Sequence, residues 1–260
     1  MRFCRFITKA GARYGIIERQ AGRDMVVPID SPFQGEPRRT GPWAALSDLK
    51  LLAPVEPGKL VCVGRNYREH AKELGNPVPD ELLTFLKPPS TVIGPGEKIV
   101  RPTITQRLDY EGELAIVIGK QCRHIREGED VRQYIRGFTC ANDVTARDIQ
   151  KKDNQWTRGK GFDTFCPVGP IVTDEIDPWK GVRVQTRVNG ELKQDGNTDQ
   201  FIFSIEEILR YITRVMTLYP GDLVPTGTPA GVGQLQAGDT VEVRIEGIGS
   251  LTNPVVNENL

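Results

Sequence analysis

The sequence predicts a strand-rich α+β fold made of two unequal domains. Strand patterns outnumber helix patterns, and the two do not alternate in the order that a doubly wound parallel sheet requires. The first fifty or so residues contain two short strand patterns and lead into a proline-rich joint at residues 53–57. We therefore expect a small N-terminal β module over residues 1–55 and a larger domain over residues 56–260.

Local patterns place the elements along the chain. Short apolar or alternating runs predict strands at residues 3–11, 12–20, 60–64, 110–119, 137–143, 182–190 and 240–249. Apolar residues at helical spacing predict helices at residues 66–74, 144–152 and 204–216. The first of these helices has a clear end, because Gly75, Asn76 and Pro77 follow it.

The charge balance excludes one class of partner. The 260 residues include 34 Lys and Arg and 34 Asp and Glu, so the formal net charge is zero. A protein that binds nucleic acid by neutralising phosphates usually has a basic excess, and we expect no such partner here. No apolar run reaches the roughly 18 residues that a membrane span needs, so we expect no membrane partner either.

The cysteines and the N-terminus predict a cytoplasmic protein. The first residues lack the apolar stretch and cleavage site of a secretion signal. The five cysteines are odd in number and scattered, without a C-x-x-C pair: Cys4, Cys62, Cys122, Cys140 and Cys166. This pattern indicates reduced, buried thiols rather than disulfides or a zinc site. A nucleophilic Cys140 or Cys166 is the alternative.

Two glutamates on one strand indicate a metal site. Glu111 and Glu113 flank a glycine in DYEGELAIVIG, so alternation places both side chains on the same face of the strand. That face continues through Ala115 and Val117, and the opposite face is also apolar, so both faces are expected to be buried. Two buried carboxylates repel each other and lose hydration unless a cation compensates them. An exposed strand end is the alternative interpretation.

A third carboxylate strengthens this interpretation. Asp143 ends the strand pattern GFTCAND and precedes the predicted helix 144–152, where its alternative role is to cap the helix. Three oxygen donors without His or Cys suit Mg²⁺ or Mn²⁺, with Ca²⁺ possible and zinc disfavoured.

Only two histidines are present, and one of them has a carboxylate at helical spacing. His70 lies three positions before Glu73 in GRNYREHAKELG, which places both on one helical face. A carboxylate beside an imidazole fixes the tautomer and raises the basicity, which suits a general base acting on water. His124 lies in a turn-like segment and is expected at the surface.

Two glycine-rich segments complete the set of candidates. Lys160 lies between Gly159 and Gly161, which suits close approach to an anion. In residues 225–233, PTGTPAGVG, the hydroxyls of Thr226 and Thr228 and the backbone amides are candidates to hold a carboxylate. A tight surface turn is the alternative for both segments, and neither is a P-loop.

Six motifs in order resemble the fumarylacetoacetate hydrolase family: GRNYREHAKELG, YEGELA, CANDVTARDIQ, WTRGKGF, VNGELKQDGNT and GDLVPTGTPAGVG. The resemblance implies a mixed β-roll with few helices, a homodimer, and an active site at the open end of the roll. The N-terminal module resembles that of bacterial members described as hydroxymuconate isomerases or 2-oxo acid hydratases.

The resemblance also implies roles for individual residues. Glu111, Glu113 and Asp143 become the metal ligands, His70 with Glu73 the general-base pair, and Lys160 the oxyanion partner. Four further residues become substrate-side or supporting groups: Arg65, Arg147, Gln150 and Thr228. One departure is that the eukaryotic fumarylacetoacetases have a further aspartate ligand upstream of their histidine, where this sequence has residues 63–66, VGRN.

The chemistry expected of such a site follows from its substrate class. A small 2-oxo acid chelates Mg²⁺, and the metal stabilises the enolate that forms when a bond to C3 breaks or a proton leaves. We expect a Mg²⁺-dependent hydrolase or lyase that cleaves a C–C bond in 2,4-dioxo or 2-oxo dicarboxylic acids. An isomerase or tautomerase of hydroxymuconate-type substrates or oxaloacetate is the alternative, and a non-catalytic protein with a structural Ca²⁺ site is the competing class.

Overall fold

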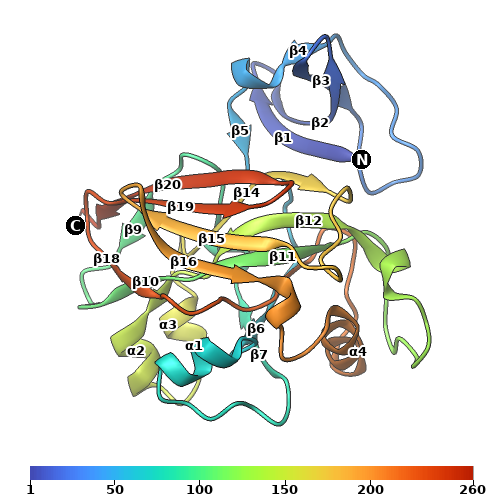
Figure 1. Cartoon of the computed structure of the whole chain (residues 1–260). Helices are drawn as coiled ribbons and strands as arrows, with labels where there is room; N and C mark the ends of the chain where they lie inside the picture. Colours follow the sequence, from blue (N-terminus) through green and yellow to red (C-terminus); the bar gives the residue numbers. More distant parts are fainter. Residues whose placement is uncertain (260) are drawn as a thin grey trace.

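The computed structural model describes residues 1–259 and is dominated by β-strands, as the sequence predicted. The strands form three sheets, and parallel pairs occur among mostly antiparallel ones. Helices are few and short. The expected strand-rich, mixed β-roll is therefore confirmed (Figure 1).

The N-terminal residues form a small lobe at one end of the largest sheet (Figure 1). Its strands are β1 (Arg2–Thr8), β2 (Gly11–Gln20), β3 (Arg23–Ile29), β4 (Ala44–Ala45) and β5 (Leu51–Leu52). The first two were predicted, whereas β3 was not. Pro28 lies inside β3, and proline weakens a strand pattern because it cannot donate to the ladder. Strand β1 pairs with β14 (Cys166–Thr173), so the lobe continues the main sheet.

The main sheet places β11 (Gly112–Ile118) near its centre, in the order β4-β3-β2-β1-β14-β12-β11-β17-β6-β7. The remaining strands on this path are β6 (Leu60–Gly64), β7 (Leu83–Lys87), β12 (Ile135–Asn142) and β17 (Leu223–Pro225). Along β11, Leu114 and Ile116 belong to one apolar core, and Ala115 and Val117 belong to another. Both faces of this strand are buried, as predicted.

Two smaller sheets complete the roll. One has the order β16-β15-β19-β20-β9, and the other β13-β10-β18. Their strands are β9 (Ile99–Arg101), β10 (Leu108–Tyr110), β13 (Thr145–Ala146), β15 (Arg183–Val188), β16 (Glu191–Asn197), β18 (Gly233–Leu235), β19 (Thr240–Ile245) and β20 (Gly249–Asn257). Val184 of β15 and Val243 of β19 share a core with β11. The short β8 (Val92–Ile93) pairs with β14.

Three short helices lie together at the end of the roll where β11 begins, at the bottom of Figure 1: α1 (Arg68–Glu73), α2 (Arg147–Lys152) and α3 (Thr157–Lys160). The fourth, α4 (Ile205–Val215), starts with a capping box in which Ser204 and Glu207 each accept a backbone N–H bond. Within residues 1–259 no helix is both long and apolar enough to cross a membrane.

The predicted helix 144–152 begins three residues late. Thr145 pairs with Asp109 in the β13–β10 ladder, and this long-range pairing keeps the chain extended until Arg147. The residue that caps α2 is Ala146, so the alternative role of Asp143 as helix cap is wrong.

Candidate metal and catalytic site

A cavity of about 380 Å³ opens beside the start of β11 and the end of β12. Its lining includes all of the predicted site residues except Glu73: Arg65, His70, Glu111, Glu113, Asp143, Arg147, Gln150, Lys160 and Thr228. These residues come from segments far apart in the sequence, and the roll brings them together.

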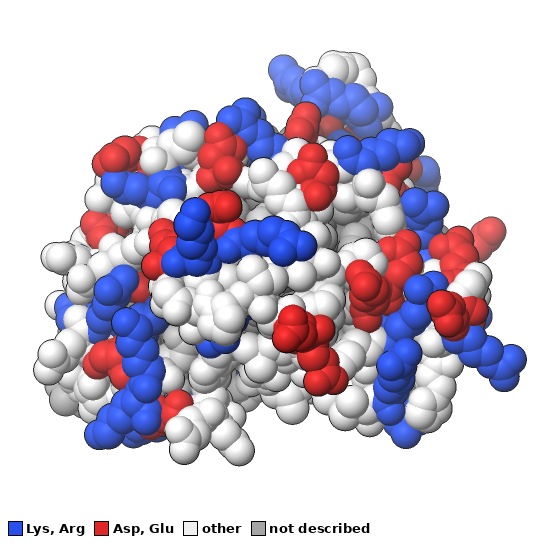
Figure 2. Space-filling model, turned by 60° about the horizontal axis from the view of Figure 1, so that its bottom comes forward, with Lys and Arg blue, Asp and Glu red and all other residues white. Residues whose placement is uncertain are grey.

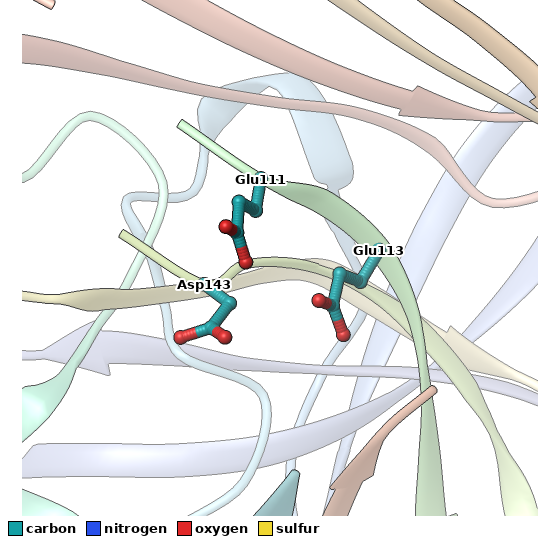
Figure 3. A group of neighbouring side chains, drawn as sticks. All are labelled: Glu111, Glu113 and Asp143. Carbon is teal, nitrogen blue, oxygen red and sulfur yellow. The ribbon is translucent and has the colours of Figure 1, made fainter. Parts of the chain in front are cut away.

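Strand pairing positions the three carboxylates. Gly112 pairs with Asn142 in the β11–β12 ladder, and the backbone N–H of Asp143 donates to the carbonyl of Glu111 over 2.8 Å. One carboxylate oxygen from each acid then lies within 4.8 Å of the other two. Figure 3 shows the side chains of Glu111, Glu113 and Asp143 pointing toward a common space.

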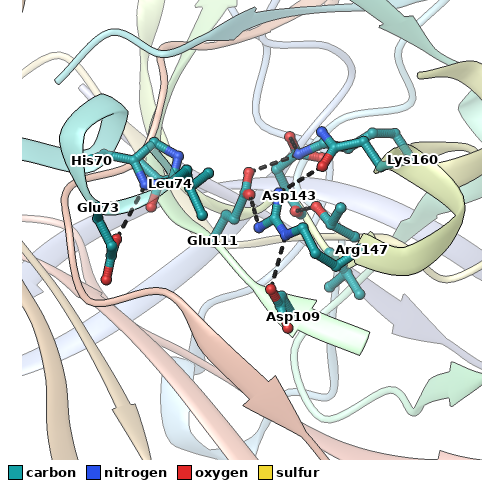
Figure 4. Close-up of polar contacts among 12 residues, drawn as sticks. His70, Glu73, Leu74, Asp109, Glu111, Asp143, Arg147 and Lys160 are labelled. Carbon is teal, nitrogen blue, oxygen red and sulfur yellow. Dashed lines mark hydrogen bonds and ion pairs between the residues drawn. The ribbon is translucent and has the colours of Figure 1, made fainter. Parts of the chain in front are cut away.

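Buried cations neutralise two of these carboxylates (Figure 4). Lys160 Nζ lies 2.7 Å from Glu111 Oε2 and 2.5 Å from Asp143 Oδ2. Arg147 also pairs with Glu111 and lies 2.8 Å from Asp109. Burial alone would raise the pKa of Glu111, but the charges of Lys160 and Arg147 outweigh it and hold that pKa below its usual range. Glu111 is therefore ionised.

Within residues 1–259, no Lys or Arg forms an ion pair with Glu113. Its carboxylate accepts a hydrogen bond from the backbone N–H of Gly227 over 2.8 Å, and the side chain is 1% exposed. Burial and the negative charges of Asp143 and Glu111 raise the pKa of Glu113 well above its usual range. A buried carboxylate in this position needs either a proton or an added cation.

The position of Glu113 supports a metal at this point. Each of the other three buried carboxylates of the cluster is paired: Asp109 with Arg107 and Arg147, Glu111 with Arg147 and Lys160, and Asp143 with Lys160 and Lys87. A carboxylate has about four lone-pair sites, so the paired oxygens can still bind a metal ion. The donors Glu111, Glu113 and Asp143 are all oxygen, which suits a hard divalent cation.

Lys87 and Asp109 also belong to the cluster and were not predicted from the sequence. Lys87 is fully buried, and its Nζ donates to Asp143 Oδ1 over 2.5 Å and to the carbonyl of Val144 over 3.2 Å. A lysine at a strand end is normally exposed, so no local signal distinguishes this one. Asp109 lies two residues before Glu111 in DYEGE, and this spacing was the only sequence feature that pointed to Asp109 as part of the site.

His70 and Glu73 lie together on α1, as their spacing predicted. His70 Nδ1 is 3.5 Å from Glu73 Oε2, which is an ion-pair distance rather than a hydrogen bond. Both Glu73 oxygens accept from the backbone N–H of Gly231, at 3.1 and 3.2 Å. Figure 4 shows the imidazole between Glu73 and Glu111. Burial lowers the pKa of His70, although the charge of Glu111 opposes this, and the ring is neutral near pH 7.

Two of the candidate donors in residues 225–233 bond to acceptors within the protein. Gly227 donates to Glu113, and Thr226 Oγ1 donates to the carbonyl of Leu114 over 2.8 Å. Gly227 has a positive φ of 96°, and a Cβ there would lie 2.7 Å from the Cβ of Asn66. The loop therefore fixes Glu113 through its backbone. Thr228 also donates to a backbone carbonyl while it lines the cavity.

The segment around Lys160 is a helical turn and not a surface loop. Helix α3 packs on α2 so closely that a Cβ on Gly159 would lie 2.8 Å from the backbone nitrogen of Gln150. Lys160 is thereby buried, with its ammonium at the carboxylates.

We expect Gly159→Ala to destabilise the protein and to reduce its activity. The added methyl group must push α3 away from α2, and such overpacking costs about 1–3 kcal/mol. Both Gln150 and Lys160 line the cavity, so the shift also displaces the site. Urea unfolding measures the first effect. The control is Gly190→Ala, which does not touch the cavity: a Cβ there meets nothing within 4 Å, but its φ of 82°, unlike that of Gly159, strains an alanine, so this variant should lose stability and keep its activity. Equal activity in wild type and Gly159→Ala would contradict this account of Lys160.

The alternative nucleophiles, Cys140 and Cys166, do not line the cavity. All five cysteines are free and buried, and burial raises the pKa of Cys166 to about 12. A thiol with this pKa is not a nucleophile near neutral pH. His124 is exposed, as predicted.

Comparisons with known proteins agree with this geometry. Residues 59–256 match the family model described as fumarylacetoacetate (FAA) hydrolase C-terminal, and residues 1–54 match the model described as Rv2993c-like, N-terminal. "Protein Rv2993c" of Mycobacterium tuberculosis is 44% identical over 264 residues, which covers 99% of each chain. The human "Oxaloacetate tautomerase FAHD2A, mitochondrial" is 44% identical over 222 residues, which covers 81% of this chain and 70% of that protein.

Solved structures resemble the whole chain. The crystal structure of 2-hydroxyhepta-2,4-diene-1,7-dioate isomerase from Mycobacterium marinum has a TM-score of 0.91 and 44% identity, and the match covers 100% of both chains. That of 5-carboxymethyl-2-hydroxymuconate delta-isomerase from Mycobacterium smegmatis has a TM-score of 0.91 and 41% identity, covering 99% of this chain and 100% of the other.

Proposed function

Because this chain belongs to the fumarylacetoacetate hydrolase family, we propose that it is a divalent-metal-dependent enzyme that interconverts the keto and enol forms of a small 2-oxo acid. The observation that carries the proposal is the buried carboxylate triad with His70 in the same cavity. A structural Ca²⁺ site needs no adjacent base and no open cavity, so the competing non-catalytic interpretation is disfavoured.

Glu111, Glu113 and Asp143 would hold the metal, with Mg²⁺ as the first choice and Mn²⁺ or Ca²⁺ as alternatives. With a divalent ion held there, the site would supply a positive charge that lowers the free energy of negative charge developing on the keto oxygen of a 2-oxo acid.

His70 is the proposed base that removes a proton from C3 and, as the imidazolium, gives a proton to the keto oxygen to form the enol; the reverse reaction takes the proton from the enol hydroxyl and returns one to C3. Its ring is neutral, it lines the cavity, and Glu73 stabilises the imidazolium that forms. Lys160 is not a competing base. Burial alone would lower its pKa, but the charges of Asp143 and Glu111 raise it, so the ammonium stays protonated. Lys160 therefore orients Glu111 and Asp143 and adds positive potential beside the keto oxygen.

The names of relatives favour isomerisation over the C–C cleavage expected from the sequence. The human relative is named an oxaloacetate tautomerase, and two structures of similar fold are named isomerases. Cleavage is the second candidate, because the pairing of His70 with Glu73 also suits activation of water.

A substrate panel tests the proposal. Acetylpyruvate, fumarylpyruvate, oxaloacetate and a hydroxymuconate are each incubated with the Mg²⁺-loaded protein, and the products are identified. We expect isomers of the input as the main products. Net release of pyruvate from the acylpyruvates would instead support the cleavage candidate.

The pH profile of Glu73→Gln tests the base assignment. The charge of Glu73 raises the pKa of His70 against the larger, lowering effect of burial. Its removal should lower that pKa further, so the acid limb of kcat/KM should move to lower pH while the plateau falls. An unmoved acid limb would show that another group sets it.

We also propose that the protein is a homodimer, as the resemblance implies. Light scattering should report twice the single-chain mass of 28.9 kDa. A mass of one chain would contradict this.

A further inference from the structure

Acidic and basic side chains are interspersed over the end of the molecule where α1, α2 and α3 lie (Figure 2). A mixed surface of this kind gives little long-range attraction for a cation. The affinity of the site for a divalent ion therefore depends on how its buried ligands are held. For Glu113, the holding group is the backbone N–H of Gly227.

One peptide group connects Glu113 to a second buried side chain, that of Asn66. The N–H of this peptide group belongs to Gly227 and donates to Glu113 Oε2 over 2.8 Å. Its carbonyl belongs to Thr226 and accepts from Asn66 Nδ2 over 2.9 Å. A peptide group is planar, and its N–H and C=O point in opposite directions, so a bond at one end fixes the direction of the other end.

Asn66 is itself held firmly between β6 and α1. It is 0% exposed, and its Oδ1 accepts from the backbone N–H of Phe203 over 2.8 Å. Its Nδ2 donates to the carbonyl of Phe203 over 3.2 Å as well as to Thr226, and its backbone carbonyl accepts from the N–H of Ile202 over 2.9 Å. The carboxamide cannot turn without losing these bonds.

The other anchors of the loop do not hold this peptide group. The N–H and Oγ1 of Thr226 donate to the carbonyl of Leu114, at 3.0 and 2.8 Å, and Thr228 Oγ1 donates to another carbonyl of β11 over 2.8 Å. These bonds fix the residues on either side of the peptide group. Gly227 has a φ of 96°, and glycine adopts both signs of φ, so its own backbone permits the group to turn over. The bond from Asn66 opposes that rotation.

We propose that Asn66 is a positioning residue for metal binding, which holds the Thr226–Gly227 peptide group with its N–H toward Glu113 and so keeps this carboxylate directed at the space it shares with Glu111 and Asp143. The inference rests on the proposed function, in that these three acids are the metal ligands. A ligand that is oriented before the ion arrives has less ordering to lose on binding. Partners of this kind, which orient metal ligands without touching the metal, typically contribute about ten- to a hundredfold to affinity.

Asn66→Ala and Asn253→Ala provide the first test. Asn253 is the matched control, because it is buried, donates to the backbone carbonyls of Gly94 and Glu97 at 2.9 and 2.8 Å, and does not line the cavity. Both variants should unfold at lower urea concentration than wild type, since each leaves buried carbonyls without a donor. Only Asn66→Ala should weaken Mg²⁺ binding, by about ten- to a hundredfold in calorimetric titration of the folded protein.

A second measurement uses the wild type and so does not require a variant to fold. The sequence contains two Thr-Gly pairs, Thr40–Gly41 and Thr226–Gly227. Protein labelled with ¹³C at the threonine carbonyls and ¹⁵N in glycine gives one carbonyl-correlated amide signal for each pair. Gly41 is exposed and is the internal control. In the metal-free protein the Gly227 amide should exchange with solvent at least about a hundredfold more slowly than the Gly41 amide.

Three results would overturn the inference: Mg²⁺ affinity of Asn66→Ala equal to that of wild type, equal losses of affinity in Asn66→Ala and Asn253→Ala, or rapid exchange of the Gly227 amide in the metal-free wild type. If Asn66→Ala does not fold, the exchange measurement decides. Mg²⁺ binding that requires Asn66 in a protein that isomerises no 2-oxo acid would support the inference and contradict the proposed function. Absence of Mg²⁺ binding from wild type would contradict both.

Discussion

Glu113→Gln should abolish tight Mg²⁺ binding and lower kcat/KM by about three orders of magnitude or more, since metal stabilisation of developing charge supplies several kcal/mol. The substitution keeps the shape of the side chain and its bond from Gly227, and removes only the charge that no protein cation neutralises. Asp143→Asn should act in the same direction. Calorimetric titration with Mg²⁺ measures the binding, and a substrate assay at saturating Mg²⁺ measures the rate.

The same variant separates a metal site from a structural acid. Without metal, the buried carboxylate of Glu113 is stabilised only by the N–H group of Gly227. Removing its charge should therefore cost no stability, so Glu113→Gln should unfold at the same temperature as wild type or higher when a chelator is present. The matched control is Asp153→Asn, which removes a cavity carboxylate that Arg158 already neutralises and should leave Mg²⁺ affinity unchanged. If Glu113→Gln binds Mg²⁺ as tightly as wild type, the assignment of Glu113 as a metal ligand is wrong.

His70→Ala should lower the rate of keto–enol interconversion by about 10²–10⁴, which is the usual contribution of a positioned general base. Hydrolysis of acetylpyruvate, if the protein performs it, should fall by a similar factor. Decarboxylation of oxaloacetate should fall less, because loss of CO₂ requires no removal of a proton from carbon. The rates are compared at equal Mg²⁺ occupancy, so that lost metal is not mistaken for a lost base.

His124→Ala is the control for this experiment, since His124 is exposed and does not line the cavity. It should behave as wild type. Equal losses on all three reactions in His70→Ala would show that His70 positions the substrate, and the base assignment would have to be abandoned.

Features that depend on neighbours in sequence were predictable. Alternation along a single strand placed Glu111 and Glu113 together, and helical spacing placed His70 beside Glu73. Both patterns need no knowledge of the rest of the fold. The position of Asp143 was also accessible, because it ends one strand pattern and the other two acids begin another.

Features that depend on contacts between segments far apart in the sequence could not be predicted. Lys87 reaches Asp143 only because β7 and β12 end near each other, and nothing in the local sequence marks this lysine as buried. Helix α2 starts late because Thr145 pairs with Asp109. The loop 225–233 was assigned to a ligand because its donors were visible in the sequence, whereas their acceptors, such as Glu113, lie on another strand.

The rate at which enol oxaloacetate disappears is the most direct test of the central claim. The ultraviolet absorbance of the enol is followed after mixing with Mg²⁺-loaded protein, and pyruvate is measured in the same sample with a coupled lactate dehydrogenase assay. We predict that with wild type the enol disappears much faster than in Mg²⁺ buffer alone, and faster than pyruvate is released. With Glu113→Gln or His70→Ala, the enol should disappear at about the rate in buffer. Loss of the enol no faster than in buffer, or pyruvate release that keeps pace with it, would contradict the assignment as a tautomerase.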